Sequence, residues 1–155
     1  MPSPRVAIIY GSPTDHDTMA QAGAMLERFD VLYDETFISP HRSPRTLQDW
    51  IAELEPRDIE VVIAGGSQPA LPGIVASLVT MPVIGVPMRS GAVAGLDGLL
   101  AMTEMATGVP VATVGLGNAK NAAVLAVQIL AVADPALRVK LSQFKDAFEA
   151  AAAGR

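Results

Sequence analysis

A chain of 155 residues, half of them hydrophobic, is long enough to bury one core and short enough to form a single domain. Sixteen acidic residues against eleven Lys and Arg give a net charge of -5 without any basic run, which excludes general nucleic-acid binding because that binding needs clustered cations. The sequence has no cysteine, which excludes disulfides, a thiolate nucleophile and cysteine-based zinc sites, and with only His16 and His41 a histidine-rich metal site is not expected.

No segment has the pattern of a signal peptide or a membrane span. The first apolar run covers only residues 6–10, which is shorter than the core of a signal peptide. The longest apolar stretch near the C-terminus, 121–133, is rich in Ala, contains Gln128 and is shorter than a membrane span. We therefore expect a soluble, cytoplasmic protein that does not bind membranes.

Short runs rich in β-branched residues alternate along the chain with segments of helical length. Several runs are almost continuously apolar, as expected for strands that helices cover on both faces. The predicted strands, in chain order, are 5–11, 31–38, 59–64, 82–86 and 109–114. The predicted helices between and after them are 15–29, 43–55, 71–79, 96–105 and 118–133.

Two helix starts carry capping signals. Ser43 precedes Pro44, a pairing typical of a helix cap followed by proline at the first helical position. Asp97 is expected to cap the helix at 96–105. Within 43–55, the apolar residues recur at helical spacing on one face, at Leu47, Trp50, Ile51 and Leu54.

Five successive strand–helix units predict an open parallel sheet between two layers of helices, a three-layer flavodoxin-like α/β sandwich with strand order 2-1-3-4-5. We assign residues 1–133 to this α/β domain and residues 134–155 to a C-terminal helical extension of it. The extension is predicted to form an extra amphipathic helix over 136–153, which could pack on its own domain or on a neighbouring subunit.

In open α/β sheets the ligand lies beyond the carboxyl ends of the strands, where the strand order reverses. For the order 2-1-3-4-5, this crevice lies between the first and third strands. The loops at residues 11–15, 39–43 and 65–69 meet there, and they are rich in Gly, Ser and Pro.

Each loop has a functional and a purely structural interpretation. The hydroxyls and free N–H groups of the first loop suit a phosphate, although Thr14 or Asp15 could simply cap the next helix. In the second loop, Arg42 suits phosphate and His41 could move protons near pH 7, unless the imidazole is merely solvated. The paired glycines of the third loop would let the backbone approach a flat ligand, or would form a plain tight turn.

Nucleotide-binding fingerprints are weak in this chain. Gly115-Leu116-Gly117 begins like a dinucleotide-binding motif, but Lys120 stands at the position of its third glycine, and the sequence has no P-loop pattern. Binding of nicotinamide nucleotides or ATP through these motifs is therefore not expected.

Several stretches of the sequence match known motifs in a fixed order. They are GSPTD and SPHRSP in the first two loops, followed by PVIGVP, AGLDGLL, MATGVPVATV and GNAKNAAVLAVQIL. In these stretches, over nearly the whole chain to about Leu130, the sequence resembles the PurE family of purine biosynthesis, whose first two loops look like GSxSD and S-A-H-R/K-T. Several ordered matches on the predicted loops and strands are far more specific than any one alone.

The resemblance implies an enzyme that acts on aminoimidazole ribonucleotides without metal or organic cofactor and forms 4-carboxy-5-aminoimidazole ribonucleotide. CO2 is the other small molecule involved. Members of the family assemble with active sites at subunit boundaries, so we expect a homo-octamer or a tetramer.

The resemblance also implies roles for individual residues. Ser12, Thr14 and Arg42 would hold the phosphate, Asp15 the ribose hydroxyls, and His41 would be the general acid/base. The remaining expected substrate-binding residues, most of which would line the imidazole and carboxylate pocket, are Ser39, Ala64, Gly65, Gly66, Ser67 and Leu71.

The family has a mutase branch, which moves a carboxylate from the exocyclic nitrogen to carbon 4, and a class II branch, which carboxylates the ring directly with CO2. The third loop here, AGGSQPALPG, resembles the class II pattern AGxSNALSG more than the mutase-type AGAGGAAHLPG. The His41-Arg42 pair and PVIGVP are mutase-like, whereas Thr14 and Pro40 depart from the usual family residues. The sequence therefore leaves the branch open.

Two other functions remain compatible with the sequence. The unusual Gln68-Pro69 in the third loop would fit a PurE-like paralogue that carboxylates or decarboxylates another heteroaromatic nucleotide. A flavodoxin-like scaffold could also serve as a non-catalytic binding module, because a fold alone does not fix function.

Overall fold

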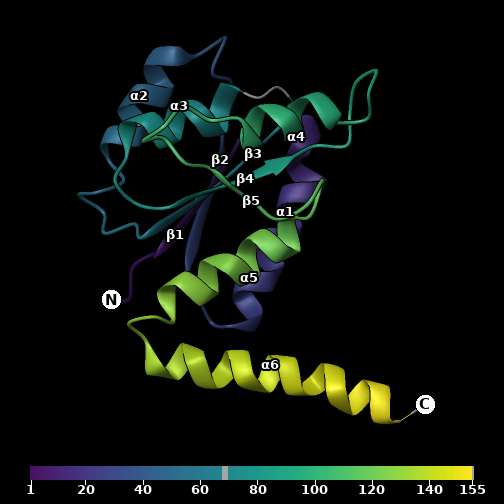
Figure 1. Cartoon of the computed structure of the whole chain (residues 1–155). Helices are drawn as coiled ribbons and strands as arrows, with labels where there is room; N and C mark the ends of the chain where they lie inside the picture. The colour runs from purple at the N-terminus through teal and green to yellow at the C-terminus, as the bar shows by residue number, and fades with distance from the viewer. Residues whose placement is uncertain (68–69, 155) are drawn as a thin grey trace.

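The computed structural model describes residues 1–67 and 70–154. Five parallel strands form one sheet in the order β2-β1-β3-β4-β5, as predicted (Figure 1). The strands are β1 (Val6–Tyr10), β2 (Tyr33–Phe37), β3 (Val61–Gly66), β4 (Val83–Pro87) and β5 (Ala112–Thr113). The chain therefore has the predicted flavodoxin-like order, and the crevice between β1 and β3 lies at the centre of the sheet.

Helices follow each strand. A short 3-10 turn, η1 (Pro13–Asp15), leads into α1 (His16–Arg28). The other helices are α2 (Pro44–Ala52), α3 (Ala70–Leu78), α4 (Leu96–Thr103), α5 (Ala119–Leu130) and α6 (Pro135–Ala153). Each overlaps its predicted segment, which confirms the alternating pattern.

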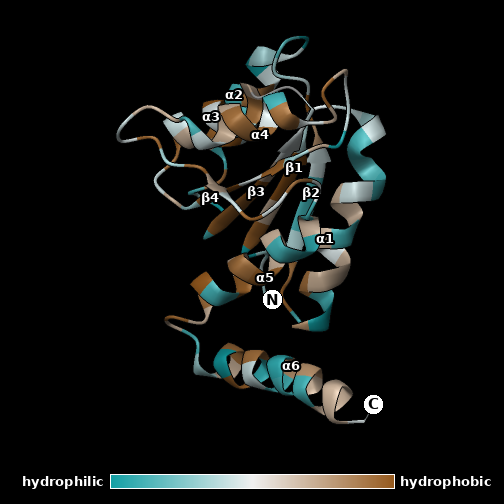
Figure 2. Ribbon diagram, turned by 45° about the vertical axis from the view of Figure 1, so that its right-hand side comes forward, coloured by the Kyte–Doolittle hydropathy of each residue, from teal (hydrophilic) through white to brown (hydrophobic). Residues whose placement is uncertain are grey.

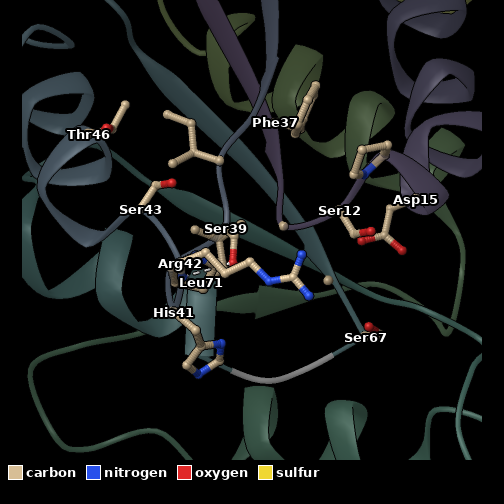
Figure 3. Close-up of a pocket in the computed structure, with 15 residues that line it drawn as sticks. Ser12, Asp15, Phe37, Ser39, His41, Arg42, Ser43, Thr46, Ser67 and Leu71 are labelled. Atoms are coloured by element: carbon tan, nitrogen blue, oxygen red, sulfur yellow. Dashed lines mark hydrogen bonds between the residues drawn. The ribbon is translucent and has the colours of Figure 1, made fainter.

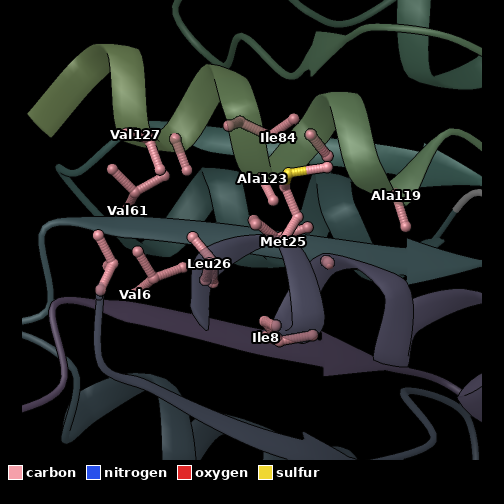
Figure 4. Packing of buried hydrophobic residues seen from close by; sticks show 14 of the residues in the cluster. Val6, Ile8, Met25, Leu26, Val61, Ile84, Ala119, Ala123 and Val127 are labelled. Atoms are coloured by element: carbon pink, nitrogen blue, oxygen red, sulfur yellow. The ribbon is translucent and has the colours of Figure 1, made fainter. Parts of the chain in front are cut away.

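Two apolar cores lie on opposite faces of the sheet. Alternate residues of β1 separate them: Val6 and Ile8 face α1 and α5, whereas Ala7 and Ile9 pack in the core with α2 and α3. All four are fully buried. Figure 4 shows the first core, where side chains of α1 and α5 meet those of β1, β3 and β4. The continuously apolar strands are thus explained by helices on both faces.

The outer strand β2 has a different composition from the central strands. Its residues are half-buried or exposed, and Figure 2 shows it as hydrophilic beside the hydrophobic β3 and β4. One side of β2 pairs with β1, and the sheet ends there. Polar side chains on this strand can therefore reach solvent or make hydrogen bonds near the edge of the sheet.

The strand predicted at 109–114 is shorter in the structure. Only Ala112 and Thr113 pair with β4, opposite Ile84 and Gly85. Pro110 has no N–H to give to a strand ladder, and Gly115 takes a φ of 128°, so the backbone leaves the extended conformation soon after Thr113. The third predicted strand, in contrast, runs two residues further, to Gly66.

The helix starts differ in detail from the expected caps. The cap of the turn before α1 is Ser12, whose Oγ accepts a hydrogen bond from the Thr14 N–H at 3.3 Å, whereas Asp15 occupies the N-cap position of α1 without a side-chain capping hydrogen bond. Ser43 is the N-cap residue of α2 and Pro44 follows it in the first turn, as predicted, but the Ser43 side chain makes no capping hydrogen bond. Asp97 lies inside the first turn of α4, because the helix begins after Gly95 at a φ of 90°.

The C-terminal helix α6 packs on its own domain. Asp134 caps it by accepting hydrogen bonds from the N–H groups of Ala136 and Leu137, and its carboxylate also pairs with Arg5 at 2.8 Å. Phe144 packs against Phe29 with ring centroids 5.2 Å apart. Within residues 1–67 and 70–154, no helix combines the length and apolarity required to cross a membrane.

Candidate active site

A cavity of about 680 Å³ opens beyond the carboxyl ends of β1, β2 and β3, where the strand-order rule places a ligand (Figure 3). Its lining comes from all three predicted loops. The residues after β1 are Gly11, Ser12, Pro13 and Asp15; those from β2 into α2 are 37–43 and Thr46; those from β3 into α3 are Gly66, Ser67 and Leu71.

Most of the predicted site residues line this cavity. They are Ser12, Asp15, Ser39, His41, Arg42, Gly66, Ser67 and Leu71. Thr14 lies beside it on the exposed side of the first turn, where its hydroxyl contacts that of Ser12 at 2.9 Å. Ala64 and Gly65 are buried in β3, beneath the cavity rather than on its wall.

The first loop holds Asp15 by a tight turn. The Asp15 N–H donates to the Ser12 carbonyl at 3.0 Å, which folds residues 12–15 back on themselves. Asp15 is only 6% exposed, so its ionisable side chain is buried. Burial raises the pKa of this carboxyl, while a hydrogen bond from the Ser12 backbone partly lowers it. The loop therefore presents a carboxyl group that keeps little of its own solvation.

The second loop is a single hydrogen-bonded turn that presents His41 and Arg42. The Ser39 Oγ accepts from the Arg42 N–H at 3.2 Å, and the Ser43 N–H donates to the Ser39 carbonyl at 2.9 Å. Figure 3 shows the Arg42 guanidinium reaching across the cavity toward the side of Ser12. Among the described residues, neither the guanidinium nor the imidazole has an ion pair or a side-chain hydrogen bond, so both are free to meet a ligand.

The paired glycines of the third segment have two different functions. Gly66 lines the cavity and its carbonyl accepts from the Met88 N–H at 3.2 Å. Gly65 instead leaves space for core packing, since a Cβ there would overlap the thioether of Met19 and the end of Met88. Of the two, only Gly66 fits the predicted close approach to a flat ligand. Gln68 and Pro69 lie outside the described residues.

The cavity also contains residues that the sequence did not single out as site residues. Phe37 ends β2 with its ring 54% exposed, and Thr46 lies in the first turn of α2. The signal for Phe37 was present in the sequence: it is a large apolar residue at the carboxyl end of an otherwise polar edge strand. The position of Thr46, three residues after Ser43, also puts it near the start of α2, facing the same loop.

The other histidine is kept apart from the cavity. The His16 Nδ1 lies 2.9 Å from the Tyr10 hydroxyl and 3.1 Å from a Glu35 oxygen, and His16 is absent from the lining. Throughout residues 1–67 and 70–154, no three side chains of His, Asp or Glu come together as metal ligands.

The cavity offers a free imidazole, a guanidinium, several hydroxyls and a buried carboxyl. These groups suit a phosphorylated, hydroxyl-bearing ligand and proton transfer.

Comparison with known families points in one direction. The family model described as AIR carboxylase matches residues 5–151. The N5-carboxyaminoimidazole ribonucleotide mutase of Pyrococcus horikoshii is 49% identical over 142 residues, which cover 91% of this chain and 80% of that protein. The mutase of the same name from Thermotoga maritima is 45% identical over 144 residues, covering 92% of this chain and 84% of that protein.

Solved structures show the same architecture. The crystal structure of Treponema denticola PurE superposes with a TM-score of 0.89 at 25% identity, covering 97% of this chain and 95% of that one. The crystal structure of a single-substitution variant of PurE2 from the same organism gives a TM-score of 0.90 at 24% identity, over 99% and 96% of the two chains. This second likeness bears on the fold alone.

Proposed function

This chain belongs to the AIR carboxylase family, and on that premise we propose that it is an N5-carboxyaminoimidazole ribonucleotide mutase. As such it is an isomerase of purine biosynthesis that converts the carboxyamino nucleotide into 4-carboxy-5-aminoimidazole ribonucleotide. The observation that carries the proposal is 45–49% identity to enzymes of that name over more than nine-tenths of the chain. The cavity at the carboxyl ends of β1 to β3 is the proposed active site.

The polar side of the cavity is proposed to bind the ribose phosphate. Arg42 and Ser12 face one another across it, and a guanidinium with neighbouring hydroxyls and N–H groups is a suitable phosphate site. Ser39 fixes the turn that presents Arg42, and Thr14 acts through its contact with the Ser12 hydroxyl. Asp15 lies next to this group and is proposed to accept hydrogen bonds from the ribose hydroxyls.

The ring and its carboxylate are proposed to lie against Gly66, Ser67 and Leu71. Ser67 supplies a hydroxyl, and the buried Leu71 supplies an apolar surface that excludes water from the ring. Ala64 and Gly65 support this wall from within β3, where a larger residue at 65 would collide with Met19 and Met88. Such a pocket would keep CO2 beside the ring, and holding two reactants together raises their effective concentration strongly.

His41 is proposed to carry the proton that the reaction moves. When the bond between the exocyclic nitrogen and its carboxylate breaks, CO2 is released and the nitrogen takes up one proton. Carbon 4 then attacks the trapped CO2 and must lose one proton to restore the aromatic ring. One imidazole can give the first proton and take the second, so the exchange balances without a redox step.

A second candidate reaction is favoured by one feature of the sequence. The third loop, AGGSQPALPG, is shorter than the mutase-type loop and lacks its histidine, as in the branch that carboxylates the ring directly with CO2. In that reaction His41 would only remove the proton from carbon 4. The two reactions give the same product in the same cavity but begin from different compounds.

The substrates distinguish the two reactions. Purified protein is incubated without ATP with either the carboxyamino nucleotide or aminoimidazole ribonucleotide plus bicarbonate, and product absorbance is followed. We expect turnover of the carboxyamino nucleotide, with the His41→Asn protein as the background control. Faster turnover of aminoimidazole ribonucleotide with bicarbonate would assign the chain to the direct carboxylases, and no turnover of either would refute the proposed function.

We also propose that the enzyme works as a homo-octamer or tetramer in the cytoplasm, where its charged nucleotide substrate is made and used. Support for assembly comes from exposed apolar side chains around α4, at Val93, Leu96 and Leu100, each more than half exposed. Light scattering of the purified chain should give the mass of four or eight copies. A monomer at micromolar concentration would contradict this.

A further inference from the structure

A small hydrogen-bonded cluster lies directly beside the proposed active site. It consists of Tyr10, His16 and Glu35, hereafter the Tyr10 cluster. The Tyr10 hydroxyl lies 2.9 Å from His16 Nδ1 and 2.9 Å from the Glu35 carboxylate, and the third side of the triangle, His16 Nδ1 to Glu35, is 3.1 Å. These residues end β1, begin α1 and lie within β2. The cluster thus ties three elements together where the cavity begins.

Counting protons shows how the three contacts are satisfied. The tyrosine hydroxyl has one proton, which it donates to the Glu35 carboxylate. The remaining two contacts both involve His16 Nδ1, and each faces an oxygen lone pair. They are attractive only when Nδ1 carries a proton, which it then shares between Tyr10 and Glu35. The cluster therefore favours the forms of His16 that carry a proton on Nδ1, and it holds the orientation of the ring.

The environment keeps Tyr10 as a permanent donor. Its side chain is 4% exposed, and burial together with the hydrogen bond to Glu35 raises the pKa of the phenol to about 12. The hydroxyl therefore stays protonated throughout the physiological range. Because it is anchored on the buried end of β1, it provides a fixed point for the side chains of the other two residues.

The Tyr10 cluster contacts the cavity wall on two sides. His16 directly follows Asp15, the buried carboxyl of the cavity, and is the first residue of α1. On the other side, the Tyr10 ring stacks on Phe37 at a centroid distance of 6.3 Å and an angle of 26°, and Phe37 lines the cavity. No member of the cluster lines the cavity itself, so the cluster can act on a ligand only through these neighbours.

We propose that Tyr10 and Glu35 are positioning residues, which clamp His16 and thereby hold the Asp15 carboxyl in place for the ribose hydroxyls. This inference rests on the proposed function, since it takes Asp15 as the ribose ligand. Backbone bonds also shape this turn, from the Asp15 N–H to the Ser12 carbonyl and from the His16 N–H to the Pro13 carbonyl, but the clamp adds side-chain bonds from α1 to β1 and β2. Small displacements of a binding group weaken binding measurably.

The chain offers a matched control for a merely structural hydrogen bond. Tyr33 begins β2 and donates its hydroxyl to Glu27 at 3.1 Å, at the far end of the same helix α1. Burial and the Glu27 hydrogen bond also raise the pKa of Tyr33. Tyr10→Phe and Tyr33→Phe each remove one hydroxyl that joins a strand to a glutamate. Only the Tyr10 hydroxyl also contacts His16, the residue that follows Asp15 in the chain.

The test measures KM and kcat of both variants with the nucleotide substrate, and dissociation constants for the product and its 2′,3′-dideoxy analogue. We expect Tyr10→Phe to raise KM and the product dissociation constant by about fivefold, the usual effect of one lost hydrogen bond, with little change in kcat. The analogue lacks the hydroxyls that Asp15 would hold, so its binding should not change. Glu35→Gln keeps an oxygen acceptor for Tyr10 and should retain most of the affinity.

Three results would overturn the inference: product affinity unchanged in Tyr10→Phe, an equal loss with the dideoxy analogue, or an equal loss in Tyr33→Phe. If the wild-type protein neither turns over nor binds the nucleotides, the proposed function fails instead. Amide hydrogen exchange then still tests the clamp without any ligand. Tyr10→Phe should speed exchange at residues 14–17 while Tyr33→Phe should not, and equal exchange there in both would refute it.

Discussion

The two histidines of this chain follow neighbouring strands and yet have opposite environments. His16, after β1, shares its Nδ1 proton with Tyr10 and Glu35 and lies outside the cavity. His41, after β2, lines the cavity and has no side-chain hydrogen bond among the described residues. Position at the carboxyl edge of a sheet therefore does not by itself leave an imidazole free for proton transfer. An imidazole whose proton is already committed to neighbours is a structural group, while an uncommitted one can carry protons.

Replacing the two histidines one at a time tests this contrast directly. His41→Asn should lower kcat by about 100-fold or more, the usual scale for a general acid/base, without changing the fold. His16→Asn keeps an N–H close to the position of Nδ1–H, so the loss in kcat should be at least about tenfold smaller than that in His41→Asn. Steady-state kinetics with circular dichroism as a folding control measures both. Equal losses in kcat would erase the distinction between the two imidazoles.

The same contrast applies to two arginines of the second loop and the helix after it. Arg42 lines the cavity, whereas Arg45, three residues later, does not. Arg42→Ala should raise KM by about 10- to 100-fold, because a lost hydrogen bond to a charged group costs about 1.5–3 kcal/mol. Arg45→Ala is the control and should leave KM near that of the wild type. An unchanged KM in Arg42→Ala would place the phosphate elsewhere.

Asp15 allows a test in which activity and stability move in opposite directions. Burial raises the pKa of its carboxyl, so the folded state binds the proton more tightly than the unfolded chain does. Ionisation therefore costs stability, fully above the raised pKa and not at all well below the ordinary value of 3.8. Asp15→Asn should raise Tm at pH 7 while weakening substrate binding by about tenfold.

The pH dependence of Tm checks the cause of that stabilisation. The difference in Tm between Asp15→Asn and the wild type should shrink as the pH falls toward 3.8 and below, because the wild-type carboxyl is then protonated. A lower Tm at pH 7 in Asp15→Asn would contradict this, because it would mean that the carboxylate stabilises the fold.

The smallest effect on catalysis is expected at the far end of the molecule. Asp134 caps α6 and pairs with Arg5, and the Arg5 hydrogen bond holds the pKa of this carboxyl below its ordinary value. Its stabilising contribution is present above pH 3.8 and is lost as the pH falls through the lowered pKa. Asp134→Ala should lower Tm at neutral pH, by less in acid, and leave kcat/KM unchanged. A loss of kcat/KM would link α6 to the site.

The fold was predictable because the sequence patterns that indicate its strands and helices are local and recur along the chain. Residues 6–10 and 61–64 are continuously apolar and predict buried strands, while Leu47, Ile51 and their neighbours predict the buried face of α2. The strand order was predicted from five successive strand–helix units in a chain of this length, and the position of the cavity was then predicted from that order. The edge strand β5 was overestimated because pairing depends on the partner and on Pro110, neither of which β propensity measures.

The site was predictable in its loops but not in its contacts. The carboxyl-edge rule identified the loops with Ser12, His41 and Ser67, all of which line the cavity. No sequence pattern indicated that Gly65 serves the packing of Met19, or that His16 is held by Glu35. Both depend on side chains that meet only after β1, β2 and α1 have assembled, so no spacing along the chain records them.

The central claim is that His41 exchanges a proton with carbon 4 of a nucleotide bound in the cavity, and a crystal structure with bound 4-carboxy-5-aminoimidazole ribonucleotide tests it most directly. We predict that carbon 4 lies within about 3.5 Å of an imidazole nitrogen of His41, a distance at which reaction is possible, with the phosphate on Arg42 and Ser12. A nucleotide bound with carbon 4 beyond reach of His41, or seated beside His16 instead, would contradict the account.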